Sequence, residues 1–231
     1  MKCLLITGAS TGIGLQTALQ FIQAGYHVVN LSRRPCPVAE VTHLNCDLAN
    51  PNFLESIENE LVDVLKNATQ IVLLHNAAKL ANDQIDNTSS DALREVLEIN
   101  IVAPNSLNRF VLPHMKPGSS IIYVGSTLSE KAVPGSFSYV TSKHASVGMM
   151  RATCQDLAGR EIHTACVCPG FTDTEMLRTH VPEDVMPAIA NMSAFGRLVS
   201  PDEIADTLLW AAGHPVINGA VLHANLGQVE R

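Results

Sequence analysis

The stretch Lys2-Cys3-Leu4-Leu5-Ile6-Thr7-Gly8-Ala9-Ser10-Thr11-Gly12-Ile13-Gly14 decides the fold. It opens with an apolar run, which predicts a strand covered on both faces, and a helix is expected to follow as far as about Ala24. A glycine-rich turn between a strand and a helix lets backbone N–H groups and the helix N-terminus meet a pyrophosphate. The order of strand, glycine-rich turn and helix therefore favours a nucleotide-binding turn. The spacing Gly-x-x-x-Gly-x-Gly differs from the better-known Gly-x-Gly-x-x-Gly, and glycine-rich turns also occur in ordinary loops.

The rest of the chain alternates strands with helices. Further apolar runs predict strands at 27–32, 41–45, 70–75, 120–125, 162–168 and 221–224. The connection 33–40 is too short for a helical crossover and contains Pro35 and Pro37, so we expect a bare loop there. The pattern predicts an α/β fold, namely a single Rossmann domain over residues 1–231. Its doubly wound parallel sheet should have about seven strands, with helices on both faces.

Two helix starts are marked in the sequence. Asn50 followed by Pro51 predicts a cap and a first helical position. Ser200, Pro201 and Glu203 combine a proline start with a capping box. We therefore expect one helix to begin near residue 50 and another near residue 200.

The amino-acid composition favours some classes of binding partner over others. Only 16% of the 231 residues are charged, against about 25% in an average soluble domain. This low charge predicts surface that is buried between subunits, and hence a homo-oligomer. The net charge of −7 argues against nucleic acid or an anionic membrane as a partner. No stretch approaches the ~20 apolar residues of a membrane span.

The cysteines and histidines favour a cytoplasmic protein without a metal. The six cysteines are scattered with no Cys-x-x-Cys, and we interpret Cys166 and Cys168 as small buried hydrophobes. The nine histidines are dispersed and include no His-Glu-x-x-His. The apolar start at residues 1–7 is too short for a signal peptide.

Tyr139 and Lys143 form a second motif, four residues apart. In a helix their side chains leave the same face, one turn apart. A free phenol has a pKa near ~10 and is a poor base at neutral pH. An ammonium about 4 Å away, at an effective dielectric of about 20, favours the phenolate by roughly 4 kcal/mol. The pair is suited to proton transfer, although the same spacing also arises by chance on half-exposed helices.

These motifs together resemble the short-chain dehydrogenase/reductase family. The resemblance is carried by residues 7–14, Asn76-Ala77, Asn100, Ser126, Tyr139-x-x-x-Lys143, Pro169-Gly170-x-x-x-Thr174 and Gly196-Arg197-x-x-x-Pro201. It covers nearly the whole chain. It implies hydride transfer between a nicotinamide and a carbonyl or alcohol.

The resemblance implies four catalytic residues. Tyr139 would donate a proton to the carbonyl oxygen, and Lys143 would assist it and hold the nicotinamide ribose. Ser126 would orient the carbonyl, unless it only caps local backbone. Asn100 would hold a water that links Lys143 to solvent.

The resemblance also implies the cofactor contacts. Thr174 and the backbone after Pro169 would hold the nicotinamide carboxamide, and Asp47 would meet the adenine unless it is a plain turn residue. The full set is Gly8, Ser10, Thr11, Gly12, Ile13, Gly14, Arg33, Asp47, Asn76, Ala77, Tyr139, Lys143, Pro169, Gly170, Thr172 and Thr174.

Arg33 predicts NADP as the cofactor, with NAD less favoured. An acidic residue after the second strand would pair with a ribose 2′-hydroxyl. This chain has Ser32-Arg33-Arg34 there, so Arg33 can pair with a 2′-phosphate. A solvated surface arginine is the alternative.

Several residues depart from the family pattern. The family's Asn-Asn-Ala-Gly is replaced by His75-Asn76-Ala77-Ala78, and we interpret His75 as a packed histidine at a strand end. Ala165 stands where an asparagine is common, and the tail at 218–227 lacks the usual Asp-Gly-Gly. We expect these changes to affect contacts with the edge of the cofactor and contacts between subunits more than the catalytic reaction.

Two segments carry further expectations. Residues 171–195 should form a mobile lid over an apolar substrate, although their apolar side chains also suit a subunit contact. Those side chains are Met176, Leu177, Met186, Ile189, Met192 and Phe195. In the helix expected over 90–114, Pro104 lacks the N–H that would bond to the carbonyl of Asn100. We expect a kink there that exposes this carbonyl, with packing alone as the alternative role of Pro104.

The sequence therefore predicts a cytoplasmic NADP-dependent carbonyl reductase or alcohol dehydrogenase. By the resemblance it would be a homotetramer, and the apolar side chains of the expected lid indicate a small, apolar carbonyl substrate. One alternative is a 3-oxoacyl-carrier-protein reductase, whose acidic carrier would need a basic rim such as Lys131 and Arg178. Another is a nucleotide-sensing regulator without turnover.

Overall fold

Seven parallel strands form one sheet in the computed structural model, which describes residues 1–228. The strands are β1 (Lys2–Thr7), β2 (His27–Ser32), β3 (Thr42–Asn45), β4 (Gln70–His75), β5 (Ser120–Val124), β6 (His163–Pro169) and β7 (Ala220–Ala224). Their order is β3-β2-β1-β4-β5-β6-β7, and every neighbouring pair is parallel. The predicted Rossmann sheet is confirmed. The strand order reverses between β1 and β4, which is where open α/β sheets bind their ligands.

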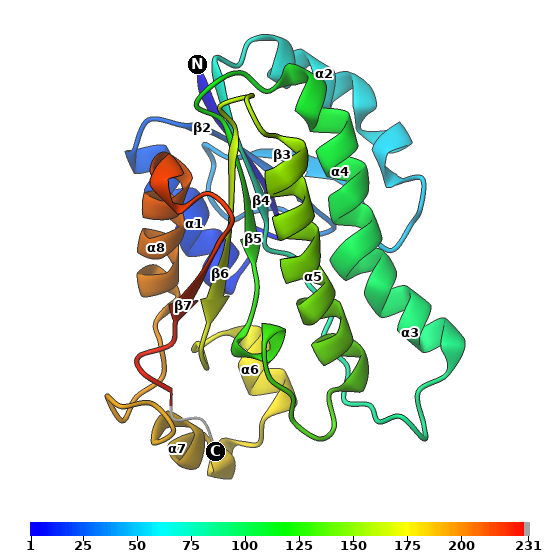
Figure 1. The fold of residues 1–231 in the computed structure, drawn as a ribbon, viewed down its shortest axis with the longest axis vertical. Helices are drawn as coiled ribbons and strands as arrows, with labels where there is room; N and C mark the ends of the chain where they lie inside the picture. The colour runs from blue at the N-terminus through cyan, green and yellow to red at the C-terminus, as the bar shows by residue number, and fades with distance from the viewer. Residues whose placement is uncertain (229–231) are drawn as a thin grey trace.

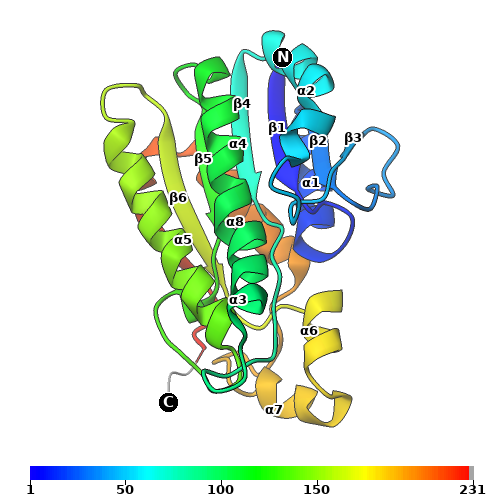
Figure 2. The ribbon, with the colours of Figure 1, turned by 90° about the vertical axis from the view of Figure 1, so that its right-hand side faces the viewer.

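Helices cover both faces of the sheet (Figure 1). Helices α1 (Gly12–Gln23) and α8 (Pro201–Gly213) lie on one face, and α2 (Glu58–Lys66), α4 (Ala103–Val111) and α5 (Phe137–Asp156) pack on the other. Helices α3 (Ser90–Leu97), α6 (Glu175–His180) and α7 (Met186–Ala190) lie toward the carboxyl ends of the strands (Figure 2). Short 3-10 turns occupy Phe53–Ser56, Leu112–His114, Thr127–Ser129, Glu183–Val185 and Pro215–Ile217.

The two helix layers explain why the strands are apolar without alternation. In β1, Cys3 and Leu5 belong to the core under α2, α4 and α5, whereas Leu4 and Ile6 belong to the core under α1 and α8. All four side chains are fully buried. A strand with helices on both sides has no face left for polar residues.

The structure bears out two of three local predictions. Ser200 and Glu203 form the expected capping box at the start of α8, and no helix occupies 33–41 within the described chain. The helix start at Asn50 is wrong. The Asn50 side chain instead accepts a hydrogen bond from the N–H of Asn52, a 3-10 turn follows, and α2 begins only at Glu58. Asparagine side chains compete for backbone donors in this way and favour turns over helices.

Across residues 1–228 no helix combines the length and apolar character needed to cross a membrane.

Candidate active site

The carboxyl ends of β1, β4, β5 and β6 bring the predicted site residues to one edge of the sheet, toward the bottom of Figures 1 and 2. The glycine turn follows β1, Asn76 follows β4, Ser126 follows β5 and Gly170 follows β6. Segments far apart in the sequence thus meet at the reversal point between β1 and β4.

The glycine turn has a backbone that side chains would obstruct. Gly8 and Gly12 have φ angles of +73° and +56°, a region that favours glycine. A Cβ on Gly14 would lie 2.2 Å from the carbonyl oxygen of Gly8, so α1 begins in direct contact with the turn. Thr11 caps α1 in an extended conformation, and Ser10 and Ile13 flank it. The turn and the helix N-terminus fit a pyrophosphate, since backbone donors and the helix dipole both point there.

Two asparagine side chains hold this turn in place. Asn76 Nδ2 donates to the carbonyl oxygens of Thr7 and Gly8 at 3.0 and 2.9 Å, while the backbone N–H groups of Asn76 and Ala77 donate to Thr7 Oγ1. On the other side, Asn30 Oδ1 accepts a hydrogen bond from the N–H of Ala9 at 2.9 Å. Asn30 was not predicted as a site residue. Its one signal in the sequence is a polar amide inside an otherwise apolar strand.

Tyr139 and Lys143 lie on the same face of α5, one turn apart, as the spacing predicts. Both are buried, with exposed fractions of 8% and 4%. Lys143 Nζ lies 5.4 Å from the centroid of the Tyr139 ring. It also donates to the carbonyl oxygen of Val124, the last residue of β5, at 2.7 Å. A buried ammonium needs polar partners, and this carbonyl fixes it at the sheet edge beside the phenol.

Ser126 begins a 3-10 turn at the end of β5. Its Oγ accepts a hydrogen bond from the N–H of Leu128 at 3.1 Å, and its own N–H donates to Ser129 Oγ. The backbone-capping alternative is therefore seen in the structure. Capping uses a lone pair of the hydroxyl oxygen and leaves its O–H able to donate to a substrate.

Asn100 lies in a helix break. The helical turns between Ser90 and Val111 change to π-type over Glu98–Val102, where the N–H of Ala103 donates to the carbonyl of Glu98. A π-type turn therefore lies one turn before Pro104, where a kink is expected, and the kink with its exposed carbonyl stays a prediction. The Asn100 side chain is tied to the backbone of Lys79 through both amide atoms, at 2.8 and 3.0 Å, and donates to Ser142 Oγ at 2.9 Å. Asn100 is thus joined to the residue next to Lys143.

The segment after β6 reaches back to the glycine turn. Pro169 ends the strand, the N–H of Gly170 donates to Ala224, and Thr172 Oγ1 donates to the carbonyl of Gly170. Thr174 caps α6, and its Cγ2 would lie 3.1 Å from a Cβ on Gly12. Thr174, expected to hold the nicotinamide carboxamide, therefore lies against the glycine turn, which is expected to hold the pyrophosphate.

The adenosine side of the site is more exposed. Arg33 lies on the connection after β2 and is exposed, which is compatible both with phosphate pairing and with the alternative of a solvated surface arginine. Its neighbour Arg34 pairs with Glu175 at the start of α6, at 3.3 Å. Asp47 Oδ1 accepts a hydrogen bond from the N–H of Ala49 at 3.0 Å, which is the turn interaction considered as its alternative role.

Polar groups and thiols behind the site are packed in the core. His75 Nε2 lies 2.8 Å from Asn108 Oδ1, and burial lowers the pKa of His75 to about 4, so the ring is neutral. The Sγ atoms of the buried Cys166 and Cys168 lie 3.8 Å apart. Among residues 1–228, no group of three His, Cys, Asp or Glu side chains is placed to hold a metal ion.

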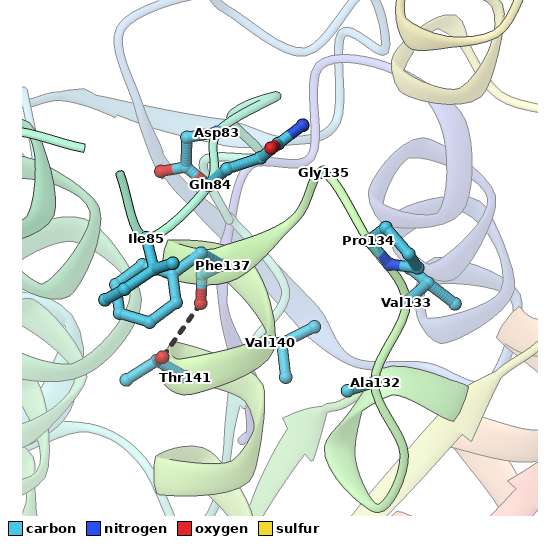
Figure 3. Close-up of a pocket in the computed structure, with 10 residues that line it drawn as sticks. All are labelled: Asp83, Gln84, Ile85, Ala132, Val133, Pro134, Gly135, Phe137, Val140 and Thr141. Carbon is cyan, nitrogen blue, oxygen red and sulfur yellow. Dashed lines mark hydrogen bonds between the residues drawn. The ribbon is translucent and has the colours of Figure 1, made fainter. Parts of the chain in front are cut away.

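A groove of about 450 Å³ runs beside the start of α5 (Figure 3). Ile85, Val133, Pro134, Phe137 and Val140 give it apolar walls. Tyr139, Lys143 and Ser126 do not line it. The groove therefore lies next to the candidate catalytic residues, since Val140 and Thr141 of α5 line it.

A glycine turn at the reversal point of a parallel sheet, with a buried Tyr–Lys pair at the same sheet edge, is typical of dinucleotide-dependent enzymes. The sequence model of the short chain dehydrogenase family matches residues 2–184. The chain belongs to this family. It is therefore an oxidoreductase that uses a nicotinamide cofactor and a small-molecule substrate.

Relatives of several kinds resemble it at moderate identity. Carbonyl reductase family member 4 of Xenopus tropicalis is 29% identical, over 96% of this chain and 95% of the relative. The 3-oxoacyl-[acyl-carrier-protein] reductase FabG of Thermotoga maritima is 28% identical, over 91% and 90%. The solved structure of aldohexose dehydrogenase from Thermoplasma acidophilum has a TM-score of 0.90 at 26% identity, over 98% and 93%.

Proposed function

We propose that this protein is an NADP-dependent oxidoreductase that interconverts a carbonyl compound and its alcohol. The observation that carries the proposal is the buried Lys143 ammonium, 5.4 Å from the Tyr139 ring and bound to the carbonyl of Val124. Such a pair has a physical use in proton transfer, because the cation stabilises negative charge on the phenol oxygen.

Three side chains carry the proposed chemistry. In reduction, Tyr139 gives its phenolic proton to the carbonyl oxygen, and the Ser126 hydroxyl donates a hydrogen bond to the same oxygen to orient it. Lys143 stabilises the phenolate that remains. A bound nicotinamide supplies the hydride.

Asn100 completes the proposed proton path. Pro104 has no N–H to donate to the carbonyl of Asn100, the helix is π-type at Glu98–Val102, and a buried carbonyl needs a donor. We place a water there that links Lys143 to solvent and restores the proton of Tyr139. The hydrogen bond from Asn100 to Ser142 supports this position, since Ser142 precedes Lys143.

NADP is the cofactor we propose, because two arginines follow β2. Arg33 is exposed there and has the charge and the planar donor groups that pair with a phosphate. The neighbouring Arg34 is engaged by Glu175, so Arg33 is the better of the two for a 2′-phosphate.

The proposed substrate is apolar, and residues 171–195 are its proposed lid. Three of the expected lid side chains, Met176, Met192 and Phe195, are 39%, 37% and 70% exposed, while Met186 is buried. Exposed methionines adapt to the shape of a ligand. The short helices α6 and α7 connect them to the site through Thr174.

A second candidate is a 3-oxoacyl-carrier-protein reductase, which the similarity to the Thermotoga maritima reductase favours. An acidic carrier protein would need positively charged side chains around the opening of the active site. Arg178, one of the two considered, is paired with Asp173 at 2.8 Å and lies 3.7 Å from Glu183. This pairing weakens the carrier alternative.

We also propose that the protein is a homotetramer of the cytoplasm. Apolar side chains at the surface support association, since Val102 and Ile85 are 43% and 75% exposed near α3 and α4. All six cysteines are thiols, the form that a reducing compartment maintains.

NADPH oxidation across a panel of ketones, aldehydes and acyl thioesters, repeated with NADH, tests the proposal. Turnover of simple carbonyl compounds with NADPH is the expected result. Preference for acyl thioesters would select the carrier reductase. Tight NADPH binding with no turnover of any compound would select the nucleotide-sensing regulator.

A further inference from the structure

The helix that carries Tyr139 begins without a cap of its own. Ser136 precedes α5, and within the described chain its side chain makes no capping hydrogen bond. The first N–H groups of any helix have no partner inside that helix. In α5 these include Phe137 and Ser138, which immediately precede Tyr139.

Asp83, from a loop more than fifty residues earlier, satisfies both groups. Its carbonyl oxygen accepts a hydrogen bond from the N–H of Phe137 at 3.1 Å. Its carboxylate Oδ1 accepts one from the N–H of Ser138 at 3.0 Å. Its own N–H donates to the carbonyl of Gly135 at 3.1 Å, and Figure 3 shows Asp83 beside the turn at Gly135. A carboxylate is the favoured partner at this end of a helix, because it also meets the positive end of the helix dipole.

The same contacts join two walls of the groove beside the site. Asp83, Gln84 and Ile85 form one wall, while Val133 to Phe137 and the first turn of α5 form the other. The Asp83 contacts therefore tie one wall of the groove to Ser138, the residue that precedes Tyr139. Lys143, one turn further along, has its own anchor at Val124.

We propose that Asp83 is a positioning residue that caps the catalytic helix from outside and thereby fixes the phenol of Tyr139. This rests on the proposed function of Tyr139. The two backbone hydrogen bonds of residue 83 survive substitution of its side chain, so variants should keep the fold and lose only the bond to Ser138. A misplacement of about 1 Å at a reacting group can cost on the order of 100-fold in rate.

Three substitutions separate the cap from the charge. Asp83→Ala removes the acceptor, Asp83→Asn keeps an oxygen at the same place without the charge, and Asp83→Glu keeps the charge but moves it by one methylene. Asp86→Ala is the matched control, since Asp86 is an exposed acid of the same loop. The measurements are kcat and KM for a carbonyl substrate of the wild type, the dissociation constant of NADPH, and amide hydrogen exchange of residues 137–140.

A fall in kcat of about 10-fold or more is expected for Asp83→Ala and Asp83→Glu, with the NADPH dissociation constant within about 2-fold of the wild type. Faster amide hydrogen exchange at residues 137–140 should accompany this fall in kcat. Asp83→Asn and Asp86→Ala should stay within about 3-fold of the wild-type kcat. If Asp83→Ala does not fold, the contrast between the Asn and Glu variants carries the test.

Wild-type kcat in every Asp83 variant would overturn the proposal. So would equal losses in the Ala and Asn variants with unchanged exchange, since the charge and not the cap would then matter. If the wild type turns over no substrate, the proposed function fails, and hydrogen exchange decides on the cap alone. Faster exchange at 137–140 in Asp83→Ala but not in Asp83→Asn would then support it, and unchanged exchange would overturn it.

Discussion

Substitution of Gly14 by alanine probes the contact between the glycine turn and α1. An ideal Cβ at this position lies 2.2 Å from the carbonyl oxygen of Gly8 and 2.6 Å from Asn76 Nδ2. Ordinary contacts begin near ~3.4 Å, so the helix and the turn would have to separate by about 1 Å. Overpacking of a well-packed site costs about 1–3 kcal/mol. The displaced amide is also one that holds the turn.

Gly14→Ala should therefore lower the free energy of unfolding by about 1–3 kcal/mol and weaken NADPH binding by about 10-fold or more. Urea titration at fixed protein concentration measures the first effect, since the stability of an oligomer depends on concentration. Fluorescence titration measures the second. The matched control is Gly213→Ala, because Gly213 is also helical and a Cβ there meets nothing within 4 Å.

The control should match the wild type in both measurements. The reasoning would be refuted if Gly14→Ala unfolded within about 0.5 kcal/mol of the wild type and bound NADPH with the wild-type dissociation constant.

Three further predictions concern the cofactor, the proton path and the buried histidine. Arg33→Ala should raise the KM for NADPH by about 10-fold and leave the KM for NADH unchanged, because the lost pairing is with a 2′-phosphate; equal effects on both cofactors would contradict it. Asn100→Ala should lower kcat by about 100-fold while NADPH binding is retained, and undiminished turnover would remove the proposed water path. Burial holds the pKa of His75 at about 4, below the 6.5 of its unfolded form, so the unfolded state binds more protons between these values. Stability should fall as the pH drops from about 6.5 to about 4, by up to about 3 kcal/mol, and His75→Asn should flatten this slope. An identical pH dependence in the two proteins would show that His75 is not its source.

Local pattern was sufficient to predict the sheet. The strand at residues 2–7 is buried on both sides and is therefore apolar throughout, and the turn after it has a backbone conformation that favours glycine. Both requirements are visible as local patterns in the sequence. The helix start at Asn50 failed because its side chain bonded two residues ahead, a choice between a cap and a turn that the sequence leaves open.

Parallel strands bring the segments that carry most of the candidate site residues to one edge of the sheet. The residues that were missed act across long distances in the chain. Asn30 supports Ala9 from the next strand, and Asp83 caps a helix that begins at Phe137. Neither belongs to a local motif, since each is defined by the backbone donor it meets in space. Such contacts depend on the three-dimensional fold and leave no pattern in the sequence.

The central claim is that Tyr139 transfers the proton that accompanies hydride transfer. Its most direct test compares NADPH oxidation by the wild type and by Tyr139→Phe, using the best carbonyl substrate of the panel and NADPH binding as the control. We expect the phenylalanine variant to keep its affinity for NADPH and its kcat to fall by about 100- to 10,000-fold. Turnover at the wild-type rate without the phenol oxygen would contradict it.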